Sequence, residues 1–600
     1  MIKRFFASKD NTISNAFKED LVTRATGSNM GASDILEVFT IYGQADSGSV
    51  ELTRFLVEFP IDEVSAARTA NQIPASGSVS FHLKLYNAAH SQPVPRNYTL
   101  DVLAVSSAWQ EGYGLDMENY EDITRNQIGS NWINAQKKTA ATATITAATP
   151  GSLSNAATFT LTNAAGTTTT YRINGGRPGS GTDDYQTQPG GTAGATIDVF
   201  FFGASTVAHV AEAITKAINA TTNAKMTATD DGTDVTVTQT VLGITGNRTN
   251  TDNSTGLGSV GNFTGAVGEW TTAGGDFHST PAFSASFETG LEDIDVDVSR
   301  IVEEWIKGPG SGGKTNYGFG VKFTAAFEAE EKSFYTKRFF GRDTQFHFYK
   351  PVLEARWNSA REDDRGCFYA SSSLASGHDN LNTLYLYNRI RGRLRDIPVA
   401  PTSASLRSSA TGANLYTAAV TRESTGIYKA DLFLQTTAST LYDVWWVSGS
   451  SGITAYNTGS ISVKSFYGYG YNPEETYFLS MPGLRKEYRK NQTHRLNLYV
   501  REKDWSPNIY TTAIRNPIPP TIVHSASYQL RRSIDDYVVV PYGTGSTLHT
   551  ALSYDVSGNY FDLDTTYLES GYLYEVQYSF YDEENGWEEQ PYRFKFRVVD

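Results

Sequence analysis

Cysteine is nearly absent from this sequence, since Cys367 is the single thiol among 600 residues. An intrachain disulfide is therefore excluded, and a lone cysteine is typical of a small buried apolar side chain. Long apolar runs are lacking too. No stretch approaches the roughly eighteen consecutive apolar residues of a membrane-spanning helix, and residues 1–20 lack the apolar segment of a secretory signal. We therefore expect no membrane insertion, and folding in a cytoplasm.

Positive charge is scarce relative to negative charge. The net charge is -14 at pH 7, which argues against nucleic acid or an anionic membrane, since both attract clustered Lys and Arg. The nine histidines are scattered, without an HxxxH or HExxH spacing or a Cys/His cluster. We predict no metal site, no cofactor and no nucleic-acid partner.

Aromatic residues and turn formers are abundant instead. Phe, Tyr and Trp make up 12% of the chain, which also has 52 Gly, and this composition is typical of strands and turns. Four runs between residues 36 and 103 alternate apolar and polar residues and end in turn residues such as Gly43, Pro60 and Asn87. We predict an all-β protein with several β-sandwich domains in series and a small α+β module inserted in the first.

Shifts in composition divide the chain into domains. Residues 139–267 are rich in Ala, Thr and Gly and nearly uncharged, unlike the aromatic-rich sequence on both sides, which indicates an insertion. Within it, we expect two hairpins, the second turning at Asp231 and Gly232, and one helix with Ser205 as its N-cap. The predicted parts are a discontinuous DNRLRE-like sandwich over 1–357, the insert over 139–267, a connector over 358–395, an Ig-like sandwich over 396–473 and a C-terminal β-domain over 474–600.

A GxxxxGK[ST] match spans residues 308–315, but its surroundings contradict a nucleotide site. A phosphate-binding loop follows a strand and opens a helix, whose first N–H groups hold the phosphates. Here the apolar spacing predicts a helix before the glycines, N-capped by Ser299, and a strand after them. We predict a flexible turn in which no helix dipole assists Lys314.

Residues 36–138 joined to 268–357 resemble the DNRLRE-type β-sandwich family. The matching segments, in the family's order, are LTRFLVEFP, VSSAWQEG, GEWTTAGGDF, DVDVSRIVEEWIKG, NYGFGVKF and YKPVLEARW. The resemblance implies a β-sandwich, and some members of that family bind polysaccharides.

The insert and the C-terminal unit are similar in pattern to modules of structural proteins from tailed bacteriophages, especially marine ones. The C-terminal segments that carry this likeness are LRKEYRKNQTHRLNLYVREKDW and SYDVSGNYFDLDTTYLESGYLYEV. The similarity implies a virion component that is assembled in the host cytoplasm.

Two acidic segments are candidates for calcium. Asp293, Asp295 and Asp297 alternate, so their carboxylates would share one face of a strand, although Asp297 also suits the start of the following helix. The DDGTD segment at 230–234 resembles part of a calcium loop without its distal Glu, and a hairpin turn explains it better. We favour the structural interpretation of both.

Catalytic patterns are lacking. There is no GxSxG nucleophile elbow, and adjacent acids such as Glu303 and Glu304, or the pair at 588–589, are typical of a solvated surface. Trp109, Trp270 and Trp305 offer a sugar platform in one interpretation and sandwich core in the other, which large aromatics more often form. We predict that the chain is not an enzyme.

Three tyrosines form the most distinctive candidate site. Tyr467, Tyr469 and Tyr471 alternate with other residues of a glycine-rich segment just outside a predicted strand, and exposed tyrosines of this kind commonly build protein interfaces. We predict an interdomain or intersubunit contact there, with simple packing and glycan binding as the alternatives.

These features favour a non-enzymatic structural component of a tailed-phage virion, in its neck, tail or baseplate. We expect it to form homo-oligomers and to contact other virion proteins. The alternative is a carbohydrate-binding or host-adhesion protein whose partner is a host-surface glycan.

Overall fold

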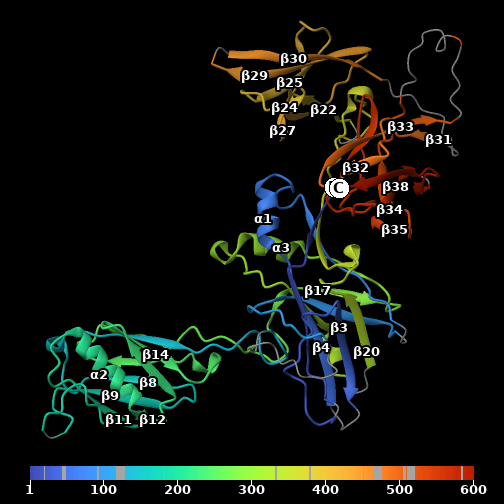
Figure 1. Ribbon diagram of the computed structural model, residues 1–600. Coiled ribbons are helices and arrows are strands. Elements are labelled where there is room, and N and C mark those ends of the chain that lie inside the picture. The colour runs from blue at the N-terminus through green and yellow to red at the C-terminus, as the bar shows by residue number, and fades with distance from the viewer. Residues whose placement is uncertain are drawn as a thin grey trace. The chain divides into compact units, whose positions relative to one another are not determined.

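The predicted fold class is confirmed, because the chain is nearly all β, with 44% strand and 9% helix (Figure 1). Within the described ranges, no helix is long and apolar enough to cross a bilayer. The chain divides into two compact units: unit 1 contains Met1–Arg4, Asn71–Ser80 and Ala355–Asp600, and unit 2 contains Phe5–Ala70 and Phe81–Glu354. The computed structural model describes residues 1–600 except 19, 44–48, 91–93, 116–128, 180, 331–333, 378–379, 451, 465–475, 504–508, 510–519 and 583–584.

Unit 2 is built on a seven-stranded sheet. Six strands follow the order β17-β6-β19-β4-β3-β20, and β2 also pairs with β4. Successive side chains of a strand point to opposite faces, so β6 buries Tyr98, Leu100 and Val102 on one face. The strands of unit 2 outside the insert are β2 (Lys9–Ser14), β3 (Ile35–Gly43), β4 (Ser49–Glu58), β5 (Ser80–Leu85), β6 (Tyr98–Val105), β17 (Phe277–Phe287), β18 (Ile294–Asp297), β19 (Phe319–Phe323) and β20 (Phe334–Phe340), and the boundary between the units falls within β1 (Ile2–Phe6) and β21 (Val352–Arg356).

Three helices accompany this sheet: α1 (Ile61–Thr69), α3 (Ser299–Lys307) and α4 (Ala325–Glu328). The helix predicted before the glycines is α3, but its N-cap is Val298 and not Ser299. The Asp297 carboxylate accepts the Ser299 N–H at 2.9 Å, and the Ser299 hydroxyl accepts the Phe81 N–H at 2.7 Å. The prediction of Ser299 as N-cap was therefore wrong. Its hydroxyl accepts a backbone N–H of β5, and the Asp297 carboxylate accepts the first N–H of the helix in its place.

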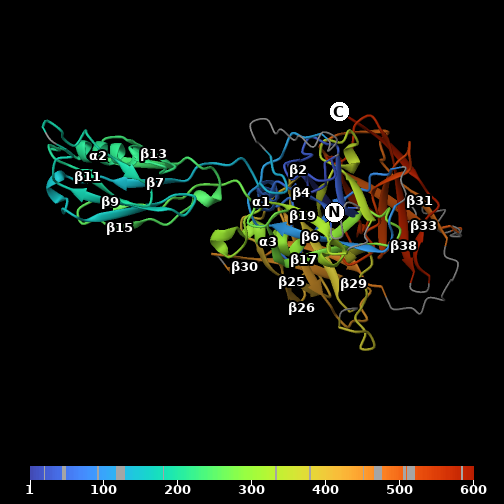
Figure 2. The ribbon, with the colours of Figure 1, turned by 90° about the horizontal axis from the view of Figure 1, so that it is seen from below.

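The insert is an α+β module with its own core. Its sheets follow β11-β9-β8-β15 and β13-β14-β7-β16, and both predicted hairpins are present as β8–β9 and β13–β14. Figures 1 and 2 show α2 (Val207–Asn219) lying along these strands. The strands are β7 (Thr142–Thr146), β8 (Thr158–Thr162), β9 (Thr168–Asn174), β10 (Gly191–Thr192), β11 (Thr196–Phe200), β12 (Thr221–Thr222), β13 (Met226–Asp230), β14 (Asp234–Gln239), β15 (Thr251–Asn253) and β16 (Ser259–Val260).

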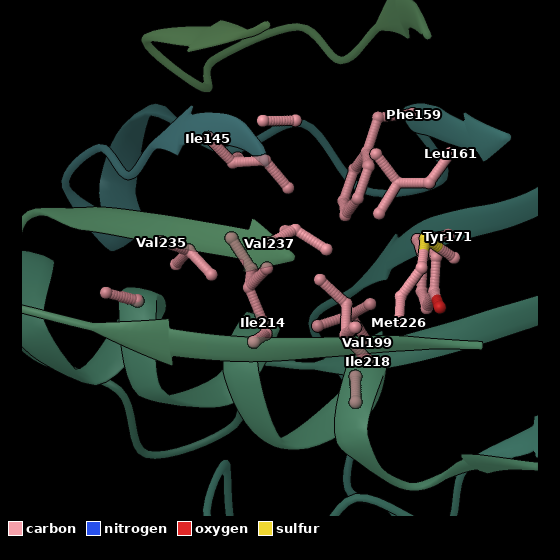
Figure 3. Close-up of a cluster of buried hydrophobic side chains, with 14 of the residues drawn as sticks. Ile145, Phe159, Leu161, Tyr171, Val199, Ile214, Ile218, Met226, Val235 and Val237 are labelled. Atoms are coloured by element: carbon pink, nitrogen blue, oxygen red, sulfur yellow. The ribbon is translucent and has the colours of Figure 1, made fainter. Parts of the chain in front are cut away.

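Side chains from both sheets and from α2 converge in this core. Ile145 of β7, Phe159 of β8 and Ile214 of α2 are fully buried together (Figure 3). The N-cap of α2 is Thr206, whose hydroxyl accepts the His209 N–H at 3.3 Å, and not Ser205 as predicted. A capping hydroxyl must lie three residues before the N–H that it accepts, so Ser205 is one residue too early.

Unit 1 contains a sandwich of two facing sheets, β22-β28-β27 and β26-β25-β29-β30, which is the arrangement of an Ig-like domain. Their buried faces meet around Tyr428 and Trp445. The five predicted strands are present as β25, β26, β28, β29 and β30, and β22 lies in the range 358–395 that was predicted as a connector, because it pairs with β28. The strands are β22 (Asn382–Tyr387), β23 (Arg389–Ile390), β24 (Arg393–Leu394), β25 (Pro401–Arg407), β26 (Asn414–Ala419), β27 (Thr421–Ser424), β28 (Ile427–Leu432), β29 (Thr440–Gly449) and β30 (Gly452–Ser462).

The C-terminal β-domain of unit 1 also has two main sheets. They follow β31-β33-β37-β36 and β32-β40-β38-β34-β35, with β39 paired to β38. Tyr528 of β34 stacks on Phe561 of β37 with ring centroids 4.0 Å apart, which joins the two sheets through their core. The strands are β31 (Tyr477–Ser480), β32 (Glu487–Arg489), β33 (Thr493–Glu502), β34 (Ala526–Arg532), β35 (Tyr537–Val540), β36 (Ser553–Asp555), β37 (Gly558–Asp564), β38 (Leu573–Asp582), β39 (Gly586–Glu589) and β40 (Phe594–Val599).

Candidate functional site

The glycine turn at 308–315 has the predicted order of helix, turn and strand, since it joins α3 to β19. Its backbone donors are already used within the turn. The N–H of Gly313 donates to Gly308 O at 2.9 Å, and that of Lys314 donates to Glu304 O at 3.2 Å. A phosphate cradle requires free N–H groups at a helix start, so this turn does not provide one.

The Lys314 side chain is also engaged. Its ammonium forms an ion pair with the Glu304 carboxylate, one turn from the end of α3. Beyond it, the Asn316 amide donates to Phe59 O at 2.9 Å and accepts the Gly318 N–H at 3.0 Å, which fixes the turn to the end of β4. Lys314 thus holds a turn in place.

A cavity of about 340 Å³ lies beside this turn. It is lined by the end of β4, the start of α1 and the turn itself, including Glu58, Asp62, Lys314 and Trp305. Trp305 is 3% exposed, and its indole N–H has no hydrogen-bond partner among the described residues. The Trp305 indole N–H is therefore a buried, unpaired donor in the wall of this cavity.

The three tryptophans considered as a sugar platform are core residues. Trp109 and Trp270 are 3% and 4% exposed. Their indole N–H groups donate to the backbone carbonyls of Tyr317 and Asn131, each at 2.8 Å. Buried rings cannot stack on a sugar, so the core interpretation is confirmed for these two, and Trp305 is equally buried.

The alternating aspartates have separate structural partners. Asp293 accepts a backbone N–H at 2.7 Å, and Asp297 serves the start of α3. The Asp295 carboxylate lies 3.0 Å from the His82 ring nitrogen. Each carboxylate thus has a protein partner of its own, as the structural interpretation expects.

The DDGTD segment forms the turn of the β13–β14 hairpin, as predicted. Gly232 has a φ of 91°, a left-handed conformation that glycine adopts without strain. The Asp231 carboxylate accepts the N–H groups of Thr233 and Asp234 at 2.9 and 2.8 Å, and these bonds lower the pKa of Asp231 to about 2.

The adjacent acids do not form pairs that face one another. Glu303 binds the Arg68 guanidinium through two bonds, at 2.7 and 2.6 Å, while Glu304 binds Lys314. Glu588 and Glu589 follow each other on β39, where successive side chains point to opposite faces. Neither pair has the geometry of a glycosidase site.

The tyrosines proposed as an interface, Tyr467, Tyr469 and Tyr471, lie outside the described residues. Their predicted role in a contact stays a prediction.

Strand β30 is an exposed sheet edge. Its one strand neighbour among the described residues is β29, and nine of its eleven residues are exposed. It contains neither a charged residue nor a proline, the two devices that most often block an edge strand. One register shift, at Tyr456, interrupts the pairing, and the Tyr456 hydroxyl donates to Asn388 at 2.9 Å. Among the described residues, no strand other than β29 pairs with β30, and the bulge at Tyr456 is the one edge-blocking feature within this strand.

A buried ion pair connects the segment before the Ig-like sandwich to β29. It was not predicted from the sequence. Asp443 is fully buried, and Arg365 of the 3-10 turn η6 (Asp364–Gly366) donates to its two oxygens at 2.8 and 2.7 Å. Burial alone would raise the pKa of Asp443, but the bonds from Arg365 and from the Trp445 indole outweigh it and hold the pKa below its ordinary value. A Cβ at Gly459 would lie 2.5 Å from an Asp443 oxygen, so only glycine fits opposite the carboxylate. The signal in the sequence is a single Asp within the apolar strand LYDVWWV.

Comparisons with known proteins add no functional information. Neither a protein-family model nor a curated protein matches the chain. Solved structures match parts of it: Salmonella alpha-2-macroglobulin reacted with methylamine is 12% identical over 41% of this chain and 16% of that chain, with a TM-score of 0.13. The titin domains z1z2 in complex with telethonin are 14% identical over 37% of this chain and 87% of that chain, with a TM-score of 0.12. The tandem Ig repeats of Dlar are 11% identical over 36% and 89%, also at 0.12.

The match covers 16% and 20% of the first two structures, which are the Salmonella and Escherichia coli alpha-2-macroglobulins. At such TM-scores, the likeness supports no argument about activity or partners. The site must therefore be judged from this chain's own residues.

Proposed function

We propose that this chain is a non-enzymatic structural component of a tailed-phage virion, in the neck, tail or baseplate. It assembles there as a homo-oligomer and contacts other virion proteins through its β-domains. The observation that supports this proposal most strongly is the open, uncharged edge of β30.

An open edge strand presents unpaired N–H and C=O groups, and another strand satisfies them by extending the sheet. Soluble monomers usually block such an edge with Lys, Pro or a covering segment. The sequence GITAYNTGSIS of β30 has no such residue, and the exposed side chain of Ile453 adds apolar surface at 69% exposure. An edge of this kind fits a protein whose working state is an assembly.

The engaged charges of unit 2 point in the same direction. Arg68, Glu303, Glu304 and Lys314 form ion pairs that fasten helices and the glycine turn to one another. Groups that are committed to structural contacts are poorly placed to transfer protons or bind substrate. We therefore infer a scaffold role for these residues.

The first experiment asks where the protein resides. Particles purified on a density gradient from cells that produce the protein should contain it in several copies, as measured by quantitative mass spectrometry. If the particle fractions lack the protein, the virion role is wrong.

The second experiment tests the edge of β30 in the full chain. Replacing the exposed residues Thr454 and Thr458 with Lys places two charges on β30, and we expect self-association, measured by sedimentation velocity, to fall at least about tenfold. The matched control replaces Thr142 and Thr144 with Lys, because these exposed threonines lie on the inner strand β7, which is paired on both sides. Equal association of both variants and the parent would contradict assembly through β30.

The alternative function, binding of a host-surface glycan, is favoured by the cavity beside the glycine turn. In this proposal, a bound sugar reaches the unpartnered Trp305 N–H, which is buried in the cavity wall of the free protein, and hydrogen-bonds the charged wall residues. A glycan array probed with the parent and with Trp305→Phe tests this, since Phe keeps the ring and removes the donor. Hits that depend on Trp305 would support the glycan; an empty array would reject it.

A further inference from the structure

The single cysteine of the chain lies beside two other side chains that commonly bind metals. The Cys367 thiol, a carboxylate oxygen of Asp364 and a ring nitrogen of His524 all lie within 4.8 Å of one another. Cys367 is buried, Asp364 is half-buried and His524 is exposed, so the cluster extends from the core to the surface. An ion at this cluster would be shielded from solvent on the side of Cys367 and accessible from solvent on the side of His524.

The spacing within this cluster fits a tetrahedral ion. The Cys367 sulfur lies 3.6 Å from Asp364 Oδ1. Zinc–sulfur and zinc–oxygen bonds of about 2.3 and 2.0 Å at a tetrahedral angle put the two ligand atoms roughly 3.5 Å apart. The His524 ring nitrogen lies within 4.8 Å of both atoms, and its ring, which is exposed, would turn toward them to form the third bond.

The Asp364 carboxylate is held in place by residues from two other elements. The Tyr554 hydroxyl of β36 donates to Oδ1 at 2.8 Å, and the Thr383 N–H of β22 donates to Oδ2 at 2.7 Å. The His524 ring packs edge-on against the Tyr554 ring, with centroids 5.1 Å apart. Metal ligands are commonly oriented by such a surrounding layer of hydrogen bonds.

The Cys367 thiol already lies against the carboxylate that would share the ion with it, because its sulfur donates to Asp364 Oδ1. A divalent ion would take the place of the thiol proton between these two atoms.

We propose that Asp364, Cys367 and His524 bind one Zn²⁺ ion, with water as the fourth ligand. A set of one thiolate, one imidazole and one carboxylate suits Zn²⁺ better than Ca²⁺ or Mg²⁺, which prefer oxygen ligands alone. The site is independent of the assembly role proposed above.

The ion would act as a staple within unit 1. Arg365, in the same 3-10 turn as Asp364, is bound to Asp443 of the Ig-like sandwich, and Asp364 is bound to Tyr554 of the C-terminal domain. His524 precedes β34 of that domain. Zinc would therefore join the segment before the Ig-like sandwich to the C-terminal domain.

The test uses the full chain, stripped of metal with a chelator. Titration with Zn²⁺ against a chromogenic chelator should show one tight equivalent per chain. Cys367→Ser and His524→Gln should each weaken that binding about 100-fold, since even residues outside the ligand set contribute roughly 10- to 100-fold. The matched control is His278→Gln, because burial lowers the pKa of His278 as it does that of His524, but His278 is not part of the cluster.

Cobalt provides a second readout that does not depend on how the variants fold. Co²⁺ bound to a thiolate gives a charge-transfer band in the near ultraviolet, and Cys367 is the one possible source of this band. The parent chain should show the band, Zn²⁺ should abolish it, and added Zn²⁺ should raise Tm by several degrees. A parent chain without the band, or Zn²⁺ binding equally to Cys367→Ser, would show adventitious metal only and overturn the site.

Discussion

Asp10 illustrates how a single buried acid in unit 2 responds to its surroundings. It lies on β2, is 1% exposed and accepts the Arg342 N–H at 2.6 Å, while its own N–H donates to Glu111 at 2.8 Å. Burial raises the pKa of Asp10 from 3.8 to about 7, because the hydrogen bond from Arg342 offsets only part of the desolvation. Between pH 3.8 and about 7, the folded protein therefore keeps a proton on the Asp10 carboxyl that the unfolded chain has released.

This shift predicts a pH dependence of stability. A raised carboxyl pKa contributes stability that is fully present below the unfolded pKa and is lost as pH rises through the folded pKa. As pH rises from about 4 to about 7, ionisation of Asp10 should lower the free energy of unfolding by up to roughly 1.4 kcal/mol per pH unit. In Asp10→Asn this contribution to the slope should be lost while that of Asp363, whose pKa is raised to about 6, remains, as measured by urea unfolding across this range.

The control for Asp10 is an acid on the surface. Asp230→Asn, at an exposed position of β13, should leave the slope of the parent unchanged. Identical slopes in the parent and in Asp10→Asn would show that Asp10 is already ionised in the fold.

At the scale of elements, the glycine turn depends on particular residues rather than on general flexibility. Gly318 has a φ of 76°, and a Cβ there would lie 2.1 Å from Val57 O. Gly310 has no atom within 4 Å of its added Cβ and does not require a left-handed conformation. The turn and the residues that lead from it into β19 therefore contain glycines of two kinds, which the sequence alone does not distinguish.

The two kinds should respond differently to alanine. Gly318→Ala combines a left-handed conformation, which costs an L-residue about 1–2 kcal/mol, with a clash against the backbone of β4. We expect a loss of about 3 kcal/mol or more in the free energy of unfolding, measured by denaturant titration. Gly310→Ala is the matched control, with an expected change near zero, and similar losses in both variants would contradict the assigned roles.

At the scale of the whole molecule, the insert has the features of an independent folding unit. Its core includes Phe159, which is fully buried against its own sheets and helix. Its two ends meet, because the Thr139 N–H donates to Val267 O at 3.0 Å. Closely spaced ends allow a domain to be inserted into a host without distorting it.

We predict that the isolated segment 139–267 folds cooperatively, as measured by circular dichroism during heating. Phe159→Ala should lower its stability by about 3–5 kcal/mol, and should lower the matching calorimetric transition of the full chain by the same amount. The control Thr142→Ala alters an exposed position of the same sheet and should change little. An isolated segment without a cooperative transition would show that the insert requires its host.

The sequence by itself determined the local elements of this protein. Alternation of apolar residues fixed β6 and β29 as strands, because one buried face imposes a period of two on the chain. The same reasoning predicted a helix before the glycines of 308–315 and a strand after them. This order is the reverse of the one in a phosphate-binding loop, so it argued against a nucleotide site. It located the insert as well, because its composition differs from that of its host.

The tertiary structure decided which distant residues meet. Cys367 and His524 have no sequence spacing that connects them, and the partner of Asp443 lies in another element, so neither the metal cluster nor the buried ion pair is visible in the sequence. The prediction of Ser299 as an N-cap failed for the same reason, because its hydroxyl accepts an N–H from β5, whereas Ser205 was wrong by one residue along the chain. Local periodicity is written along the chain, whereas convergence of side chains arises only when the sheets have paired and packed.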